Sequence, residues 1–200
     1  MSQIKLLHSG GNGVILAAPS SNPASDRTLT LPGDANSTVD TLSRAGNILQ
    51  VISITKNDTA SLVFANDTFY NYDDVSLKVT ITPSSASNKI LLIGTIPLGL
   101  NTNVFRTIVR FHKNGSVITA AAGAADGNRA SGMSVHQANG NSTIETHNLS
   151  FQEVAGDTNS RYYNFAFAHA RNTSGNSTVY INRSYTDGNT FGTARGTANL

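Results

Sequence analysis

Two short apolar runs near the start of the chain each have the pattern of a β-strand. Residues 13–18 are almost continuously apolar, and residues 27–32 alternate leucine with threonine, which is typical of a strand with one buried face. Pro19 and Pro23 keep the linker between them extended. An isolated strand pair is marginally stable in water, so we expect the rest of the chain or identical copies of it to bury its apolar side chains: Val14, Ile15, Leu16, Leu29 and Leu31.

A connector follows this strand pair. Ser37 or Thr38 can cap a short helix that carries Val39 and Leu42 and ends at Gly46. From residue 47 the pattern changes to short strands separated by turn residues. We therefore expect two parts: an attachment or trimerisation β-segment with its connector over residues 1–46, and a β-sandwich over residues 47–200.

Period-two alternation predicts the first strands of the second part. Residues 48–55 and 76–82 each place isoleucine, leucine or valine on one face. Residues 89–97 include an apolar run, Ile90 to Ile93, with apolar side chains on both faces. We expect this strand to lie centrally, covered on one side by the partner sheet and on the other by a neighbour or subunit.

Asn114 and Gly115 predict a tight hairpin turn. A type I′ turn needs positive φ at both central residues, which asparagine and glycine tolerate best, and alternating strand residues lie on both sides of this pair. Residues 120–132 hold little to bury and predict an exposed loop. Later strands are expected at residues 147–153, 161–170 and 177–185. The whole pattern predicts an all-β protein with a jelly-roll-like antiparallel β-sandwich.

Composition narrows the classes of partner. Only 13% of the residues are charged, against about 25% in typical soluble domains, and the 14 basic and 12 acidic side chains are scattered, giving a net charge of +2. Scattered charge makes no basic stripe for a phosphate backbone, so we expect no nucleic-acid partner. No apolar run approaches the ~20 residues of a membrane span, and the N-terminus lacks the apolar region of a signal peptide, so we expect a soluble chain made in the cytoplasm.

The first 33 residues resemble bacteriophage tail-fibre and related virion appendage proteins. In these proteins an apolar strand, Ala-Pro, a polar linker and Asp-Arg-Thr-Leu-Thr-Leu-Pro precede a globular tip, and this chain has that arrangement over residues 13–32. A looser similarity covers residues 47–55 and the phrase Ile-Thr-Pro-Ser-Ser at residues 81–85. The resemblance implies a homotrimer located on the virion, joined through its N-terminal segment to tail or capsid proteins, with host-surface glycan as a further expected partner.

Few residues predict catalysis. The sequence contains no Walker loop, no Gly-x-Ser-x-Gly and no His-Glu-x-x-His. The only two glutamates, Glu145 and Glu153, are the candidates for the acid pair, about 5–10 Å apart, with which a glycosidase works. The five histidines lack the close spacing of a compact metal site. We expect no enzyme, no cofactor and no metal site, although a trimer axis would bring three copies of one histidine together.

Loop aromatics are the best candidates for ligand contact. Aromatic rings stack on sugar faces while asparagine and aspartate bind hydroxyls, and four aromatics fall in expected loops: Tyr70, Tyr72, Tyr185 and Phe191. The alternative is that these rings pack the loops onto the sandwich or fill subunit interfaces.

Three functions follow from the sequence. The first is a structural virion protein, a short trimeric tail fibre or fibre-like appendage anchored by its N-terminus. The second is a capsid decoration or cement protein whose N-terminal arm lies across capsid subunits. The third is a glycan-cleaving depolymerase, which requires Glu145 and Glu153 in one cleft.

Overall fold

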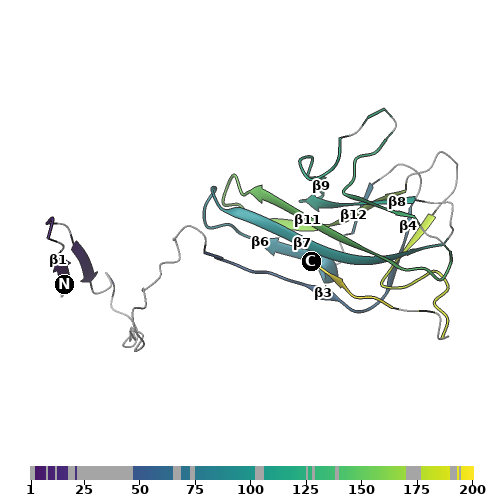
Figure 1. Cartoon of the computed structure of the whole chain (residues 1–200), viewed down its shortest axis with the longest axis horizontal. Helices are drawn as coiled ribbons and strands as arrows, with labels where there is room; N and C mark the ends of the chain where they lie inside the picture. Colours follow the sequence, from purple (N-terminus) through teal and green to yellow (C-terminus); the bar gives the residue numbers. More distant parts are fainter. Residues whose placement is uncertain are drawn as a thin grey trace. The chain divides into compact units, whose positions relative to one another are not determined.

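The structure is a computed structural model, and it separates the chain into two compact units, Met1–Leu49 and Gln50–Leu200 (Figure 1). This boundary lies close to the one expected at residue 46. The description that follows covers residues 3–7, 9–11, 13–17, 21, 47–64, 69–72, 75–101, 106–124, 126–127, 129–137, 140–169, 177–189, 193 and 195–200. The connector at residues 34–46, with its expected helix, lies outside them.

The first unit contains a two-stranded antiparallel hairpin. Strand β2 (Gly13–Ala17) forms at the expected apolar run, but it pairs with β1 (Gln3–Leu7). The strand at residues 3–7 was not predicted, and the second expected strand, residues 27–32, lies outside the described residues. The hairpin is local because Gly11, at a φ of 91°, provides the left-handed conformation of a short reversal. Leu29 and Leu31 lie outside the described residues, and Ile15 is exposed.

The second unit is a sandwich of two antiparallel sheets. The first sheet has the order β3 (Thr55–Lys56), β14 (Ala198–Asn199), β7 (Lys89–Leu100), β13 (Ser177–Ile181) and β4 (Ala60–Phe64), with β11 (Glu145–Val154) also paired to β7. The second has the order β10 (Ser134–Gln137), β8 (Arg106–Lys113), β12 (Arg161–His169) and β5 (Phe69–Asn71), with β6 (Lys78–Ile81) on β12 and β9 (Ser116–Val117) on β8. A 3₁₀ turn, η1 (Val75–Leu77), precedes β6.

The chain passes repeatedly between the two sheets, from β6 to β7 to β8 and from β10 through β11 and β12 to β13. This connectivity and the antiparallel pairing confirm the all-β sandwich. The described part of the chain contains no helix long and apolar enough to cross a membrane.

The core fills the space between the sheets with alternate side chains from each strand. The fully buried residues from the two sheets include Ile96, Leu98, Val109, Phe111, Tyr163, Phe165, Phe167, Val179 and Ile181. Gly94 lies in this layer, where an added Cβ would come within 2.9 Å of the Phe111 and Phe165 rings. The glycine therefore makes room for the aromatic pair, whose centroids are 5.4 Å apart.

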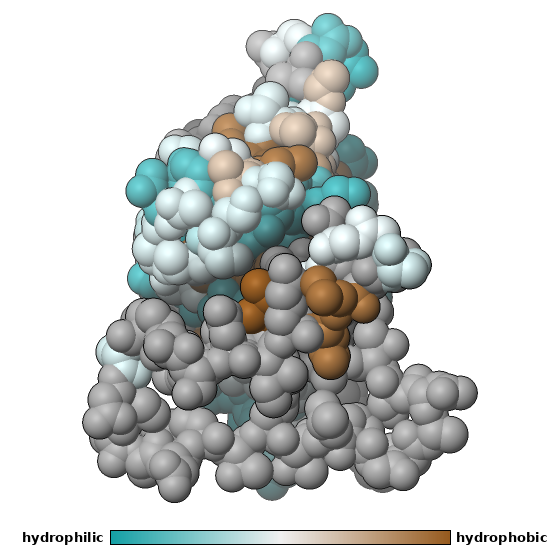
Figure 2. Space-filling view, turned by 90° about the vertical axis from the view of Figure 1, so that its left-hand side faces the viewer, coloured by the Kyte–Doolittle hydropathy of each residue, from teal (hydrophilic) through white to brown (hydrophobic). Residues whose placement is uncertain are grey.

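Strand β7 is central, as its apolar pattern predicts, since it pairs with β11, β13 and β14. Its outward side chains are open in this single chain: Leu91 is 60% exposed and Ile93 64% exposed. Figure 2 shows apolar residues that reach the molecular surface among hydrophilic ones. We call Leu91 and Ile93 the outward apolar pair.

The strand expected at residues 48–55 is largely absent. Residues 47–54 join no sheet, and only Thr55 and Lys56 form β3. Ile54 pairs by backbone hydrogen bonds with Leu200, but Ile48 and Val51 are almost fully exposed. The alternating pattern is real, yet the described part of the sandwich offers these residues no neighbouring strand.

The predicted hairpin turn is confirmed. Asn114 and Gly115 have φ values of 50° and 78° and join β8 to β9, with His112 opposite Val117 and Lys113 opposite Ser116. The expected loop at residues 120–132 is mostly exposed where it is described.

Candidate functional site

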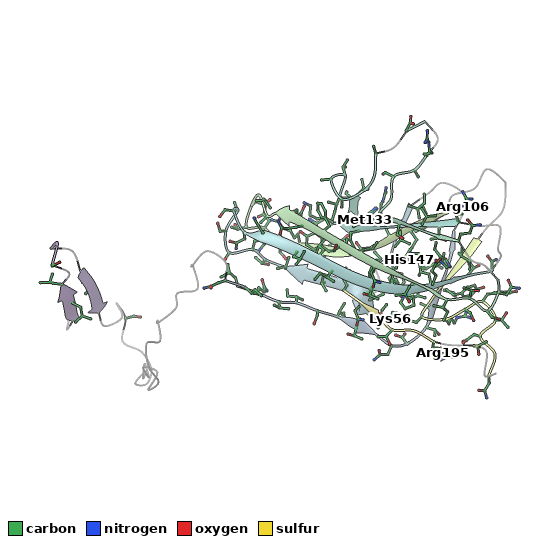
Figure 3. The ribbon with its side chains drawn as sticks, in the orientation of Figure 1. Lys56, Arg106, Met133, His147 and Arg195 are labelled. Atoms are coloured by element: carbon green, nitrogen blue, oxygen red, sulfur yellow. The ribbon has the colours of Figure 1, made fainter. Side chains whose placement is uncertain are left out.

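Two histidines and a glutamate from different sheets meet between the edges of the sandwich. We call His136, Glu145 and His147 the His–Glu–His cluster. His136 lies on β10, whose one neighbour among the described strands is β8, and the other two lie on β11, which borders only β7 in the same part of the chain (Figure 3). The cluster therefore lies where an edge strand of one sheet faces an edge strand of the other.

Strand alternation turns these side chains inward. On β10, Val135 is 55% exposed and His136 fully buried; on β11, His147 is buried between the exposed Thr146 and Asn148. Glu145 and His147 are two residues apart on one strand, so they share its inner face. The carboxylate of Glu145 is 53% exposed, which places it at the mouth of the cluster.

Each histidine has a polar partner at Nδ1. His136 Nδ1 lies 2.7 Å from Glu145 Oε2, and His147 Nδ1 lies 2.8 Å from Ser134 Oγ. The two imidazoles are nearly perpendicular, with centroids 5.2 Å apart. One potential ligand atom from each of the three cluster residues can be chosen so that all lie within 4.8 Å of one another.

Both Nε2 atoms are buried, and neither has a hydrogen-bond partner among the described residues. The same is true of Thr107 Oγ1, and Thr107 lies directly opposite His136 on β8, so it faces the same side of the sheet. Buried polar atoms are satisfied in most native structures. The cluster and the residue opposite His136 therefore hold three buried polar atoms that no described residue satisfies.

Burial disfavours the charged form of both histidines. Desolvation lowers the pKa of His136, opposed by the hydrogen bond and charge of Glu145. Desolvation, then the charge of His136, lowers the pKa of His147 to about 4, with Glu145 again opposing. Neutral imidazole is the form that coordinates a metal ion.

The arrangement is not a nucleophilic triad. In a Ser–His–acid triad the acid binds the same histidine that activates the serine, but here Ser134 contacts His147 and Glu145 contacts His136. Two imidazoles and a carboxylate are instead the donor types of a borderline transition-metal site.

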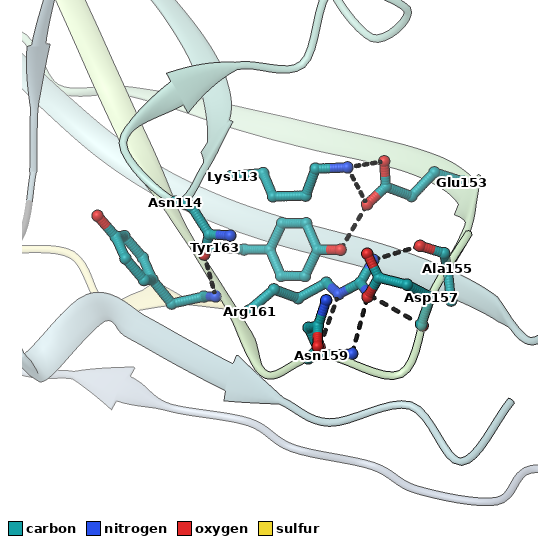
Figure 4. A network of polar contacts seen from close by, with 9 residues as sticks. Lys113, Asn114, Glu153, Ala155, Asp157, Asn159, Arg161 and Tyr163 are labelled. Atoms are coloured by element: carbon teal, nitrogen blue, oxygen red, sulfur yellow. Dashed lines mark hydrogen bonds and ion pairs between the residues drawn. The ribbon is translucent and has the colours of Figure 1, made fainter. Parts of the chain in front are cut away.

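The candidate acid pair does not form. Glu145 is the first residue of β11 and Glu153 lies near its other end, so the strand rise separates their backbones by about 27 Å. Glu153 instead accepts hydrogen bonds from Lys113 Nζ, at 2.8 and 3.1 Å, and from the Tyr163 hydroxyl (Figure 4). This corrects the depolymerase hypothesis as it was framed on these two glutamates.

The structure describes three of the four predicted glycan-contact aromatics, and one of these three is buried. Tyr72 is 4% exposed and packs edge-to-face on Phe167, so it has no free face for a sugar, which corrects that expectation. Tyr70 on β5 and Tyr185 are 39% and 45% exposed, and Tyr185 packs against Tyr180, with centroids 5.7 Å apart. Phe191 lies outside the described residues.

Spacings between histidines alone do not predict the cluster. His136 and His147 come from strands of different sheets, so their proximity depends on the way the sheets pack. The sequence Glu145-Thr146-His147 does carry a signal for such a site. Residues i and i+2 of a strand lie on the same face, and glutamate and histidine are both residue types that bind metal ions.

No protein-family model matches this chain, and a search of curated proteins finds no match to it.

Proposed function

We propose that this chain is a structural protein of a bacteriophage virion, a short trimeric tail fibre or fibre-like appendage anchored through its N-terminal segment. The resemblance of residues 13–32 to virion appendage proteins supports the viral setting. The separation of the chain into a small N-terminal unit and a sandwich is compatible with one part that attaches and one that is displayed.

The observation that carries the self-assembly part of the proposal is the outward apolar pair. Leu91 and Ile93 project outward from β7, the most extensively paired strand of the first sheet, and each is more than half exposed. Burying one such side chain fully is worth roughly 1.5–3 kcal/mol. A neighbouring copy of the chain that covers both side chains would gain part of that free energy from each of them.

The N-terminal hairpin supports the same conclusion. Two strands alone are marginally stable, and Leu6, Leu7 and Ile15 of β1 and β2 are exposed in the single chain. Three copies around an axis would close a shared core and remove the open edges. The number three comes from the resemblance.

Light scattering of the purified full chain tests this assembly. We expect a trimer, and we expect the double variant Leu91→Ser and Ile93→Ser to lower the mass or weaken the association. Val135→Ser, which alters a similarly exposed side chain on the second sheet, should leave the mass unchanged. A wild-type chain that stays monomeric at high concentration would contradict the proposal.

Removal of residues 1–33 tests the attachment role. We expect the shortened chain to stay folded but to lose binding to the virion. An antibody against the sandwich, used with electron microscopy of particles, should label the tail. Label spread over the shell would favour the capsid decoration protein instead.

A host-surface role is tested on Tyr185, the more exposed of the described aromatic candidates. Tyr185→Ala should reduce binding of the purified protein to host cells, whereas Tyr162→Ala, a change to a half-buried tyrosine on β12, serves as the matched control. Equal binding by both variants and the wild type would show that Tyr185 does not contact the host surface.

A further inference from the structure

We propose that the His–Glu–His cluster is a metal site, in which the Nε2 atoms of His136 and His147 bind one divalent transition-metal ion between the two sheets. Zn²⁺ is the best match, because it accepts imidazole and carboxylate ligands in tetrahedral geometry. Glu145 orients His136 and supplies negative charge. The site is independent of the virion role proposed above.

The spacing of the rings fits one shared ion. A nitrogen bonded to zinc lies 2.0–2.1 Å from it, so each ring centroid lies roughly 3.2 Å away and two imidazoles at the tetrahedral angle have centroids about 5.2 Å apart. The centroids of His136 and His147 are 5.2 Å apart. The separation of the rings is therefore compatible with one ion bound between them.

The Nδ1 partners are those of a metal-bound histidine. A histidine that binds a metal through one nitrogen usually donates its other ring N–H to a carboxylate or another oxygen. His136 Nδ1 faces the Glu145 carboxylate and His147 Nδ1 faces the Ser134 hydroxyl. When both Nδ1 atoms carry the proton, each Nε2 presents a lone pair.

No hydrogen-bond donor among the described residues contacts these lone pairs. His136 is fully buried and His147 is 6% exposed, and both Nε2 atoms are without a hydrogen-bond partner there. An unsatisfied buried acceptor destabilises the folded state. A bound ion removes this cost at both atoms, and the half-exposed Glu145 leaves a route by which the ion and its remaining water ligands can enter.

Zinc titration of the full chain tests the proposal. The protein is first stripped with a chelator, and bound Zn²⁺ is then measured by calorimetry and by elemental analysis. We expect one ion per chain and a rise in melting temperature with Zn²⁺, because a ligand that binds only the folded state stabilises it. His136→Gln and His147→Gln should each abolish tight binding. Glu145→Gln should weaken it by about 10–100-fold.

Matched controls separate the site from general effects of substitution. His112→Gln changes a buried histidine on β8 outside the cluster, and Asp126→Asn changes an exposed carboxylate on the loop; both should bind Zn²⁺ like the wild type. Replacement of Zn²⁺ by Co²⁺ gives a readout that needs no variant, because a four-coordinate site produces an intense visible spectrum and free aqueous Co²⁺ does not.

Three results would overturn the proposal. The first is a wild-type chain that neither binds Zn²⁺ nor melts at a higher temperature in its presence, which would mean that water occupies the cluster. The second is unchanged binding by both histidine variants. The third is one ion per three chains, which would place the ion on a symmetry axis. If the histidine variants fail to fold, the affinity of Glu145→Gln and the Co²⁺ spectrum of the wild type decide the question.

Discussion

The phenol of Tyr163 on β12 donates a hydrogen bond to the carboxylate of Glu153 on β11, so a strand of one sheet is tied to a strand of the other. Lys113 of β8 binds the same carboxylate. Burial, together with the hydrogen bond and charge of Glu153, raises the pKa of the Tyr163 phenol above its usual range. The phenol therefore remains a donor at any physiological pH, and Glu153 holds the two sheets together.

Replacement of Glu153 by glutamine should destabilise the sandwich. The amide keeps one acceptor but loses the charge that faces Lys113, and the Glu153 side chain is only 13% exposed. We expect the free energy of unfolding to fall by about 1–3 kcal/mol, measured by urea denaturation. Asp126→Asn removes an ion pair whose partners are both more than 70% exposed, and it should change stability by less than about 1 kcal/mol. Equal effects would show that Glu153 contributes no more than a surface charge.

Substitution of Gly94 by alanine should overpack the core. The added methyl group would lie 2.7 Å from Phe165 Cζ and 2.9 Å from the ring of Phe111, so the rings must move. We expect a loss of about 1–3 kcal/mol, read from the denaturation midpoint. Gly123→Ala adds the same atom in the loop, 3.6 Å from its nearest neighbour, and should leave stability unchanged or raise it by up to about 1 kcal/mol. A neutral Gly94→Ala would mean that the aromatic pair is loosely packed.

The features of the fold that local chemistry determines were predictable. Asn114-Gly115 specifies its turn through φ alone, and the alternation around Phe165 places the large aromatic side chains of β12 on one face. Residues 48–55 have an equally clear alternation, but a strand also needs a partner, and sequence periodicity carries no information on which backbone lies alongside. The pairing of β2 with β1 was not predicted for the same reason.

The candidate site was beyond prediction for a related reason. His136 and His147 meet because the edges of two sheets face each other, and no local pattern specifies that contact. Tyr72 shows the converse, since its neighbours in sequence resemble a loop while its ring packs on Phe167 in the core. In both cases the way the two sheets pack together, and not the local sequence, determines where the side chain lies.

Two substitutions of Asn114 separate backbone strain from hydrogen bonding. The side-chain Oδ1 accepts a hydrogen bond of 2.9 Å from the backbone N–H of Tyr162, and the backbone has positive φ. Asn114→Gly loses the hydrogen bond alone, at about 1 kcal/mol. Asn114→Ala also places alanine in the left-handed conformation, which should lower the free energy of unfolding by about 1–2 kcal/mol more. Chemical denaturation of both variants gives the two contributions, and identical losses would show that the conformation is not strained for alanine.

The stability of the metal-free protein should fall as the pH is lowered from about 6.5 to about 4. The pKa of His147 is lowered to about 4 in the folded chain, whereas in the unfolded chain it is near 6.5. Between these values the unfolded state binds the additional proton, so acidification favours unfolding, and below about 4 both states are protonated and the dependence on this group ends. The groups that face His147 are Ser134 on β10 and, within the cluster, His136 and Glu145.

Urea denaturation in the presence of a chelator, repeated across this pH range, measures the effect. After allowance for partial solvation we expect a loss on the order of 2 kcal/mol from this residue. His147→Gln has no titrating group at this position, so its stability should vary less between pH 6.5 and 4, even if it is lower throughout. A wild-type slope that His147→Gln leaves intact would assign the proton uptake to another group, and His136, whose pKa is also lowered, would be the next residue to replace.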